Sequence, residues 1–388
     1  MWKLQDFIYS KKSLKNYSNF LLNNKNLTQG IEVKKFERKF AKWNNSKYAV
    51  FVNSGSSANL ITIFACKEFF KWKNGDEVIV PSLTWPTTIT PIIQSNLKPI
   101  FIDTNFEDLA LNYTELKKKI SKKTKAIFLA HILGFPANMD KIISIAEKYK
   151  LKIIEDCCES IGGQFNKKKI GNFGIAGTFS LYWGHHISTI EGGLITTNNE
   201  KFYNLLKLKR SHGFARELPK KLHKKIKQEN KNIDFKFLFL TDGFNVRSTN
   251  LNAHIGLDQL KKLNLYIRKR NINYSFFLRI IKKFEDKLII IKPNKNQKIS
   301  SFAFPIIFKE KKYLEIFKNL LSMYKIEHRP IIAGNLLKQP FLKNKYSNNY
   351  KNSNLVNDCG VYIGNNQFVT KTKIKILYKI FFKVFQKK

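Results

Sequence analysis

The chain alternates short apolar runs with segments long enough to form helices, and this alternation limits its fold more than any other feature. The five clearest runs span residues 47–52, 76–81, 98–103, 125–130 and 151–156. Parallel strands need long crossovers, which helices usually supply, so the pattern predicts a mainly parallel sheet flanked by helices. Two further strands are expected at 177–183 and 192–197. The expected fold class is therefore α/β.

The pattern changes in the last third of the chain. Long helical segments begin near residue 251, and shorter strands follow at 287–293 and 300–308. This change predicts a large domain over residues 1–262 and a smaller C-terminal α+β domain over residues 263–388.

The composition excludes several classes of protein. The net charge is +42, but the lysines are spread along the whole chain, and no nucleic-acid-binding motif accompanies them. We therefore expect no nucleic-acid partner. No run approaches the roughly 20 apolar residues of a membrane span, and charge interrupts the N-terminal apolar run too early for a secretory signal. A cytoplasmic protein without stable membrane insertion is expected.

The four cysteines predict neither a metal site nor a disulfide. Cys66, Cys157, Cys158 and Cys359 include no C-x-x-C pair and no His/Cys cluster at metal-binding spacing. Reduced thiols in the core or near a site are the expected state in the cytoplasm.

Three motifs bring polar groups to the ends of predicted strands. Gly55, Ser56 and Ser57 of "SGSSAN" open a helix directly after a strand, which suits a phosphate, although a plain helix start has the same pattern. Asp156 of "IIEDCCESIGG" ends a buried strand, where it can pair with a protonated ring nitrogen or cap a helix. Trp85 follows another strand and suits stacking on a flat heterocycle.

The order of these motifs resembles the nucleotide-sugar aminotransferase and dehydratase family. The matching segments include "YAVFVNSGSSANL", "GDEVIVPSLTWPTT", "IIEDCCESIGG", "GTFSLYWGHHISTIEGG" and "NVRSTNLNAHIGLDQL". The resemblance implies the aspartate aminotransferase fold (fold type I) and the cofactor pyridoxal 5′-phosphate, which alternates with pyridoxamine 5′-phosphate. It also implies a homodimer with its sites at the interface.

The resemblance implies a cofactor role for eight residues. Gly55, Ser56, Ser57 and Ser180 would hold the phosphate, with Asn245 reaching it from the partner subunit; Trp85 would stack on the ring, Asp156 would pair with the pyridine nitrogen, and Glu159 would lie near the phenolic oxygen.

One position departs from the aminotransferase pattern. His185 stands six residues before Glu191 of the "EGG" motif, where family aminotransferases carry the lysine that forms the internal Schiff base. An imidazole cannot form a stable Schiff base, but it can transfer protons near neutral pH. We therefore predict that His185 is the catalytic residue. The neighbouring His186 is expected to be structural.

The exchange of lysine for histidine resembles the sugar 3-dehydratases. One kind uses an iron–sulfur centre and a reductase, but no cysteine lies between Cys158 and Cys359. The chain is more similar to the kind that acts on GDP-4-keto-6-deoxymannose and needs only L-glutamate and the cofactor. That resemblance implies a lyase that makes a 3,6-dideoxy-4-keto sugar for surface polysaccharides. The alternatives are a sugar aminotransferase, a CDP-linked dehydratase and a non-catalytic relative.

Four further residues are predicted to bind the nucleotide-sugar substrate. His212 and Arg216 belong to "SHGFARE", Arg247 to "NVRS" and Glu327 to "EHRP". Arginine suits bidentate binding of phosphate, which favours Arg216 and Arg247, although salt bridges at the surface or an interface have the same composition. No motif identifies the nucleobase.

Overall fold

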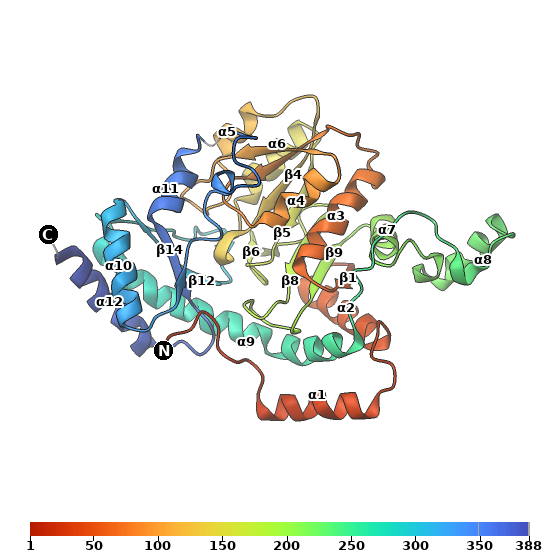
Figure 1. Cartoon of the computed structure of the whole chain (residues 1–388), viewed down its shortest axis with the longest axis horizontal. Helices are drawn as coiled ribbons and strands as arrows, with labels where there is room; N and C mark the ends of the chain where they lie inside the picture. The colour runs from red at the N-terminus through yellow and green to blue at the C-terminus, as the bar shows by residue number, and fades with distance from the viewer. Residues whose placement is uncertain (348, 387–388) are drawn as a thin grey trace.

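The computed structural model describes residues 1–347 and 349–386, and its centre is a seven-stranded sheet (Figure 1). The strands follow the order β1-β9-β8-β5-β4-β2-β3, and only β9 runs antiparallel to its neighbours. They are β1 (Tyr48–Val52), β2 (Glu77–Pro81), β3 (Lys98–Ile102), β4 (Thr124–Ala130), β5 (Lys152–Asp156), β8 (Ala176–Ser180) and β9 (Gly193–Thr197). The predicted α/β class and mainly parallel sheet are confirmed.

Helices cover both faces of the sheet because its strands are apolar on both sides. In β1, Val50 and Val52 pack towards α3 and α7, whereas Phe51 packs towards α2 and α9. The helices of this part are α1 (Lys11–Asn23), α2 (Ile31–Asn44), α3 (Gly55–Phe69), α4 (Thr90–Gln94), α5 (Tyr113–Lys118), α6 (Met139–Lys148), α7 (Glu200–Arg210) and α8 (Lys220–Glu229). Helix α8 projects away from the body of the molecule (Figure 1).

A second, antiparallel sheet forms the C-terminal part. Its order is β10-β12-β14-β13, and α10 and α12 pack beside it (Figure 1). The elements are β10 (Leu288–Ile289), β12 (Ala303–Phe308), β13 (His328–Arg329), β14 (Gly360–Gly364), α10 (Lys311–Met323), α11 (Lys351–Cys359) and α12 (Lys371–Gln386). A small third sheet consists of β6 (Gln164–Phe165), β7 (Lys168–Lys169) and β11 (Gln297–Lys298).

The long helix α9 (Asn250–Ile281) joins the two parts, and Figure 1 shows it running beneath both. The predicted domain boundary, between residues 262 and 263, lies inside this helix; the division at that point stays a prediction. In the described part of the chain, no helix is long and apolar enough to cross a membrane.

Three predicted strands are shorter than expected: the one predicted at 287–293 keeps only Leu288–Ile289, and the other two change for a visible reason. The strand predicted at 177–183 ends at Ser180, and the following residues form turns in which the His185 N–H donates to the Tyr182 carbonyl. The strand predicted at 300–308 begins only at Ala303, because the N–H groups of Ser300 and Phe302 donate to carbonyls of the 132–134 turn instead. Both differences lie beside the cavity described next.

Candidate active site

The carboxyl ends of β2, β4, β5 and β8 surround a cavity of about 350 Å³. This is the edge at which open α/β sheets bind ligands. Seven of the residues predicted from the sequence line it: Gly55, Ser56, Trp85, Asp156, Glu159, Ser180 and His185. Residues that are far apart in the sequence therefore meet in one place.

The N-terminus of α3 forms one wall of the cavity and approaches β8 closely. The Ser54 hydroxyl caps the helix by accepting from the Ser57 N–H, so the next free N–H groups belong to Gly55 and Ser56. A Cβ atom on Gly55 would lie only 2.6 Å from the Ser180 Cβ, so only glycine fits at this approach. The helix start and the hydroxyls of Ser56 and Ser180 thus form a cradle suited to a phosphate. Ser57 is adjacent but does not line the cavity.

Asp156 is buried and held in one orientation. Its Oδ2 accepts hydrogen bonds from Asn59 Nδ2 (2.8 Å) and Thr88 Oγ1 (3.0 Å), and its Oδ1 accepts one from the Cys158 N–H (3.1 Å). A carboxylate fixed in this way can accept a further hydrogen bond from a ring N–H. Trp85 lies at the rim with 55% of its surface exposed, so its ring is free to stack on a ligand.

Glu159 is an unusual carboxyl group because it lines the cavity without a cationic partner in the described chain. Burial raises its pKa to about 8, although the Leu133 N–H, which donates to Oε2 at 2.9 Å, opposes this shift. The negative charge of Asp156 raises the pKa further. Near neutral pH this side chain is therefore mostly protonated and can donate a hydrogen bond.

His185 lines the same cavity, and its Nδ1 is buried without a hydrogen-bond partner in the described chain. Burial lowers its pKa to about 4, and the charge of Arg270 lowers it further, whereas contacts with Cys158 and Asp156 oppose the shift. Its ring packs against Phe302, with the centroids 5.5 Å apart. At neutral pH the imidazole is uncharged and can accept a proton.

His186 and Arg270 lie behind His185. The His186 Nε2 lies 3.0 Å from the Ser300 carbonyl and must donate to it, while Arg270 donates to the Phe302 carbonyl at 3.0 Å. Arg270 is 1% exposed and has no carboxylate partner in the described residues, and burial lowers its pKa to about 9. These contacts hold the 300–302 segment, and with it the Phe302 ring, against His185.

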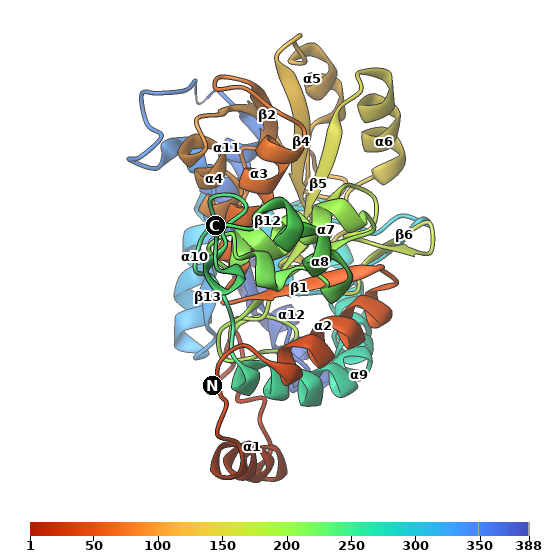
Figure 2. The same ribbon diagram turned by 90° about the vertical axis from the view of Figure 1, so that its right-hand side faces the viewer.

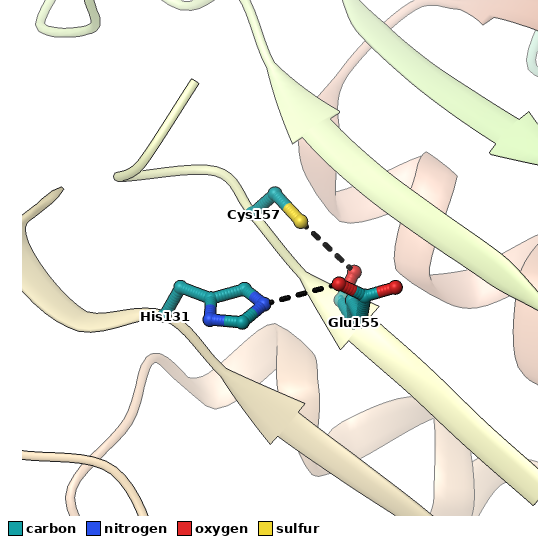
Figure 3. A group of neighbouring side chains, drawn as sticks. All are labelled: His131, Glu155 and Cys157. Atoms are coloured by element: carbon teal, nitrogen blue, oxygen red, sulfur yellow. Dashed lines mark hydrogen bonds and ion pairs between the residues drawn. The ribbon is translucent and has the colours of Figure 1, made fainter. Parts of the chain in front are cut away.

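A buried cluster of His131, Glu155 and Cys157 lies beneath the cavity and resembles a metal site (Figure 3). His131 Nδ1 accepts from the Ala137 N–H, so its proton is on Nε2, which lies 3.3 Å from Glu155 Oε2. Both oxygens of Glu155 also accept backbone N–H groups from the 171–174 turn, at 2.7–3.0 Å. Because these ligand atoms already have partners, the cluster serves to fix the turn.

Several lining residues were not predicted from the sequence. They include His131, Tyr182, Phe302, Arg329 and Tyr362. Arg329 belongs to the "EHRP" motif, two residues after Glu327. The motif was recognised in the sequence, but substrate binding was assigned to Glu327 and not to Arg329. Phe302 and Tyr362 had no signal, because Phe302 lay inside the strand predicted at 300–308 and no element or motif was predicted around Tyr362.

Five predicted residues lie outside this cavity in their own chain. The Asn245 Oδ1 accepts from Arg247 Nε at 3.0 Å, and the Glu327 Oε2 accepts from the Leu4 N–H at 2.9 Å. The His212 ring packs against Phe214, and Arg216 lines a second cavity. Their assignment to cofactor or substrate stays a prediction.

Comparisons with known proteins agree with this geometry. The family described as "DegT/DnrJ/EryC1/StrS aminotransferase family" matches residues 9–374. The GDP-4-keto-6-deoxy-D-mannose 3-dehydratase of Escherichia coli O55:H7 is 37% identical, with 93% of this chain and 94% of the relative covered. The enzyme of the same name from Yersinia pseudotuberculosis is 36% identical, with 93% of each chain covered.

A solved structure is also similar. A GDP-4-keto-6-deoxymannose-3-dehydratase with a trapped PLP–glutamate geminal diamine superposes with a TM-score of 0.90 at 35% identity, covering 98% of this chain and 100% of that one. The predicted resemblance and fold type are confirmed.

Proposed function

Because the chain belongs to the DegT/DnrJ/EryC1/StrS aminotransferase family, we propose that it is a pyridoxal-phosphate-dependent 3-dehydratase of GDP-4-keto-6-deoxymannose. The observation that carries the proposal is His185, an imidazole that lines the cavity and is uncharged at neutral pH, at the position of the missing lysine. The reaction removes water from carbon 3 of the sugar and consumes L-glutamate. Its product, a 3,6-dideoxy-4-keto sugar, suits surface polysaccharide synthesis.

The residues present fit the cofactor. Gly55, Ser56 and Ser180 lie together in the cradle because residue 55 has no Cβ, which lets the start of α3 approach Ser180 closely. Asp156 is oriented to accept from a protonated pyridine nitrogen, and Trp85 is exposed enough to stack on the ring. A protonated Glu159 can donate to a phenolic oxygen. When bound, the cofactor supplies an electron sink and carries the amino group taken from glutamate.

His185 moves the protons of the reaction. Its imidazole accepts a proton from the reacting carbon, and the resulting imidazolium can deliver that proton to the departing carbon 3 hydroxyl. A group of this kind contributes about 100-fold to 10,000-fold to the rate. Burial disfavours the charged form of His185, which promotes the second transfer.

Substrate binding and assembly complete the proposal. Arg329 already lines the cavity, and His212, Arg216, Arg247 and Glu327 are proposed to contact the nucleotide sugar. Ser57 and the partner subunit's Asn245 would add to the phosphate site of a homodimer that acts in the cytoplasm.

An aminotransferase is the alternative, and nitrogen balance separates the two. We expect purified protein with pyridoxal phosphate, glutamate and GDP-4-keto-6-deoxymannose to release equal amounts of 2-oxoglutarate and ammonia. In each cycle of the dehydratase, the amino group taken from glutamate is released into solution as ammonia. An aminotransferase would release 2-oxoglutarate without ammonia. A non-catalytic protein would release neither.

A further inference from the structure

A second cavity, of about 590 Å³, lies at the β1 edge of the large sheet. It is bounded by α2, β1, α7 and the 216–220 segment, which Figure 2 shows beside one another. None of its lining residues lines the candidate active site. The two cavities are therefore separate in this chain.

Positive side chains dominate the lining of this second cavity. Seven lysines and arginines line it, against two glutamates. Both glutamates are already bound to one partner: Arg210 Nη1 donates to Glu37 Oε1 at 2.7 Å, and Arg210 Nη2 donates to Glu217 Oε2 at 3.2 Å. Glu37 also accepts the Phe51 N–H at 2.8 Å. The remaining cations, among them Lys34 and Arg216, have no carboxylate of the cavity left to pair with.

Lys207 gives the cavity its sharpest feature. Its side chain is 8% exposed, and in the described residues its ammonium has no acceptor, only the Tyr203 ring 4.6 Å from the nitrogen to the ring centroid. Burial lowers its pKa to about 8, and the charge of Arg210 adds to this effect. The charges of Glu37 and Glu217 oppose this shift but form no direct ion pair with Lys207, so an anion in the cavity would stabilise the ammonium further.

Two more polar atoms at this cavity lack a hydrogen-bond partner. The Oε1 of Gln29 and the Nε of Arg210 are buried and find no partner in the part of the chain described. Gln29 nevertheless holds its other amide atom in place, because Nε2 donates to Glu217 Oε2 at 3.1 Å. The Arg210 Nε donor and the Lys207 ammonium both match a ligand that is anionic and accepts hydrogen bonds, whereas the Gln29 oxygen would need a donor.

We propose that this second cavity is a binding site for a phosphate or diphosphate group, separate from the site of the reaction. Phosphate oxygens accept several hydrogen bonds at once, which matches a lining that contains lysines and arginines from α2, α7 and the 216–220 segment. The cavity has room for more than a single phosphate. This site goes beyond the proposed function, in which Arg216 alone among the lining residues of the second cavity is proposed to contact the nucleotide sugar.

The test is calorimetric titration of inorganic pyrophosphate into the cofactor-loaded enzyme. We expect Lys207→Met to weaken one class of binding at least 10-fold. Lys201→Met is the matched control, because Lys201 is exposed on the same helix and does not line the cavity, and it should bind as the wild type does. Loss of an unpaired buried cation should not lower the melting temperature of Lys207→Met, which separates the effect from unfolding.

Two further comparisons show whether the site binds free phosphate groups or a nucleotide, and whether the proposal holds. Equal affinity for pyrophosphate and GDP would indicate that the phosphates alone are bound, whereas at least 10-fold tighter GDP would indicate a nucleotide site. The proposal would be refuted if wild type and Lys207→Met bound pyrophosphate equally. It would also be refuted if neither bound it, for example because a second copy of the chain fills the cavity. A 10-fold rise in the KM of Lys207→Met for the nucleotide sugar would refute it as well, since Lys207 would then serve the substrate.

Discussion

His185 illustrates how much of the chemistry depends on the surroundings of one side chain. An exposed imidazole titrates near pH 6.5, but burial beside Phe302 lowers the pKa of His185 to about 4. Arg270 adds a positive charge behind the ring and holds the Phe302 carbonyl. The residue is thus kept in the form that accepts protons.

His185→Asn is expected to reduce dehydration at least 100-fold, because asparagine cannot transfer protons in this way. The variant should still bind pyridoxamine phosphate, since the phosphate cradle and Asp156 are unchanged. Turnover of the nucleotide sugar and absorbance of the bound cofactor measure the two effects. Full activity of this variant would refute the assignment of His185.

The residues of the site that sequence reasoning found share one property: they stand next to strand ends in the large domain. Asp156 ends an apolar run, so its place at the sheet edge follows from the strand pattern, whereas Ser180 lay inside the strand predicted at 177–183 and was assigned from the family resemblance. Arg329 and Tyr362 come from the second sheet, and Phe302 lies just before its strand β12. Their position depends on contacts between distant segments, such as the Phe302 N–H with the Leu133 carbonyl, and no local pattern encodes those contacts.

Among the elements, the positions of the strands in the sequence were easier to predict than the directions in which they run or the residues at which they end. A continuous apolar run identifies β1, because Val50 and Phe51 are both buried and face opposite layers of helices. The antiparallel direction of β9 is set by its pairing with β1 and β8, and the sequence of the strand itself carries no mark of direction. The predicted boundary at 262/263 marks no break in the backbone, because α9 continues through it.

The ends of β4 and β5 depend on Glu155, which joins His131 to the 171–174 turn. Glu155→Gln would set an amide N–H₂ against those N–H donors, so we expect a loss of about 2–4 kcal/mol in stability. Thermal melting would show this as a lower transition temperature. Glu107→Gln is the control, because Glu107 forms only an exposed ion pair with Lys141 and should melt as the wild type does.

The contacts of the His131, Glu155 and Cys157 cluster predict that metal ions do not change the stability of the protein. Because the ligand atoms of His131 and Glu155 are occupied, neither zinc nor a chelator should change the melting temperature of the wild type. A rise with zinc that Glu155→Gln abolishes would show that the cluster binds the ion.

For the whole molecule, the proposed dimer predicts that two defective chains can repair each other. Asn245 does not line the cavity of its own chain, so the partner's cavity is where it would act. His185→Asn and Asn245→Ala should each be impaired alone. In a mixed dimer one site has both wild-type residues, so random mixing should restore about a quarter of wild-type activity per chain. No gain over the separate variants would place Asn245 outside the partner's site.

The most direct measurement of the central claim is the proton NMR spectrum of the product. The protein would be incubated with pyridoxal phosphate, glutamate and GDP-4-keto-6-deoxymannose until the substrate is consumed. A histidine in place of the anchoring lysine predicts a new methylene signal at carbon 3 of the sugar. A product that carries an amino group at carbon 4 and keeps the carbon 3 hydroxyl would contradict the account.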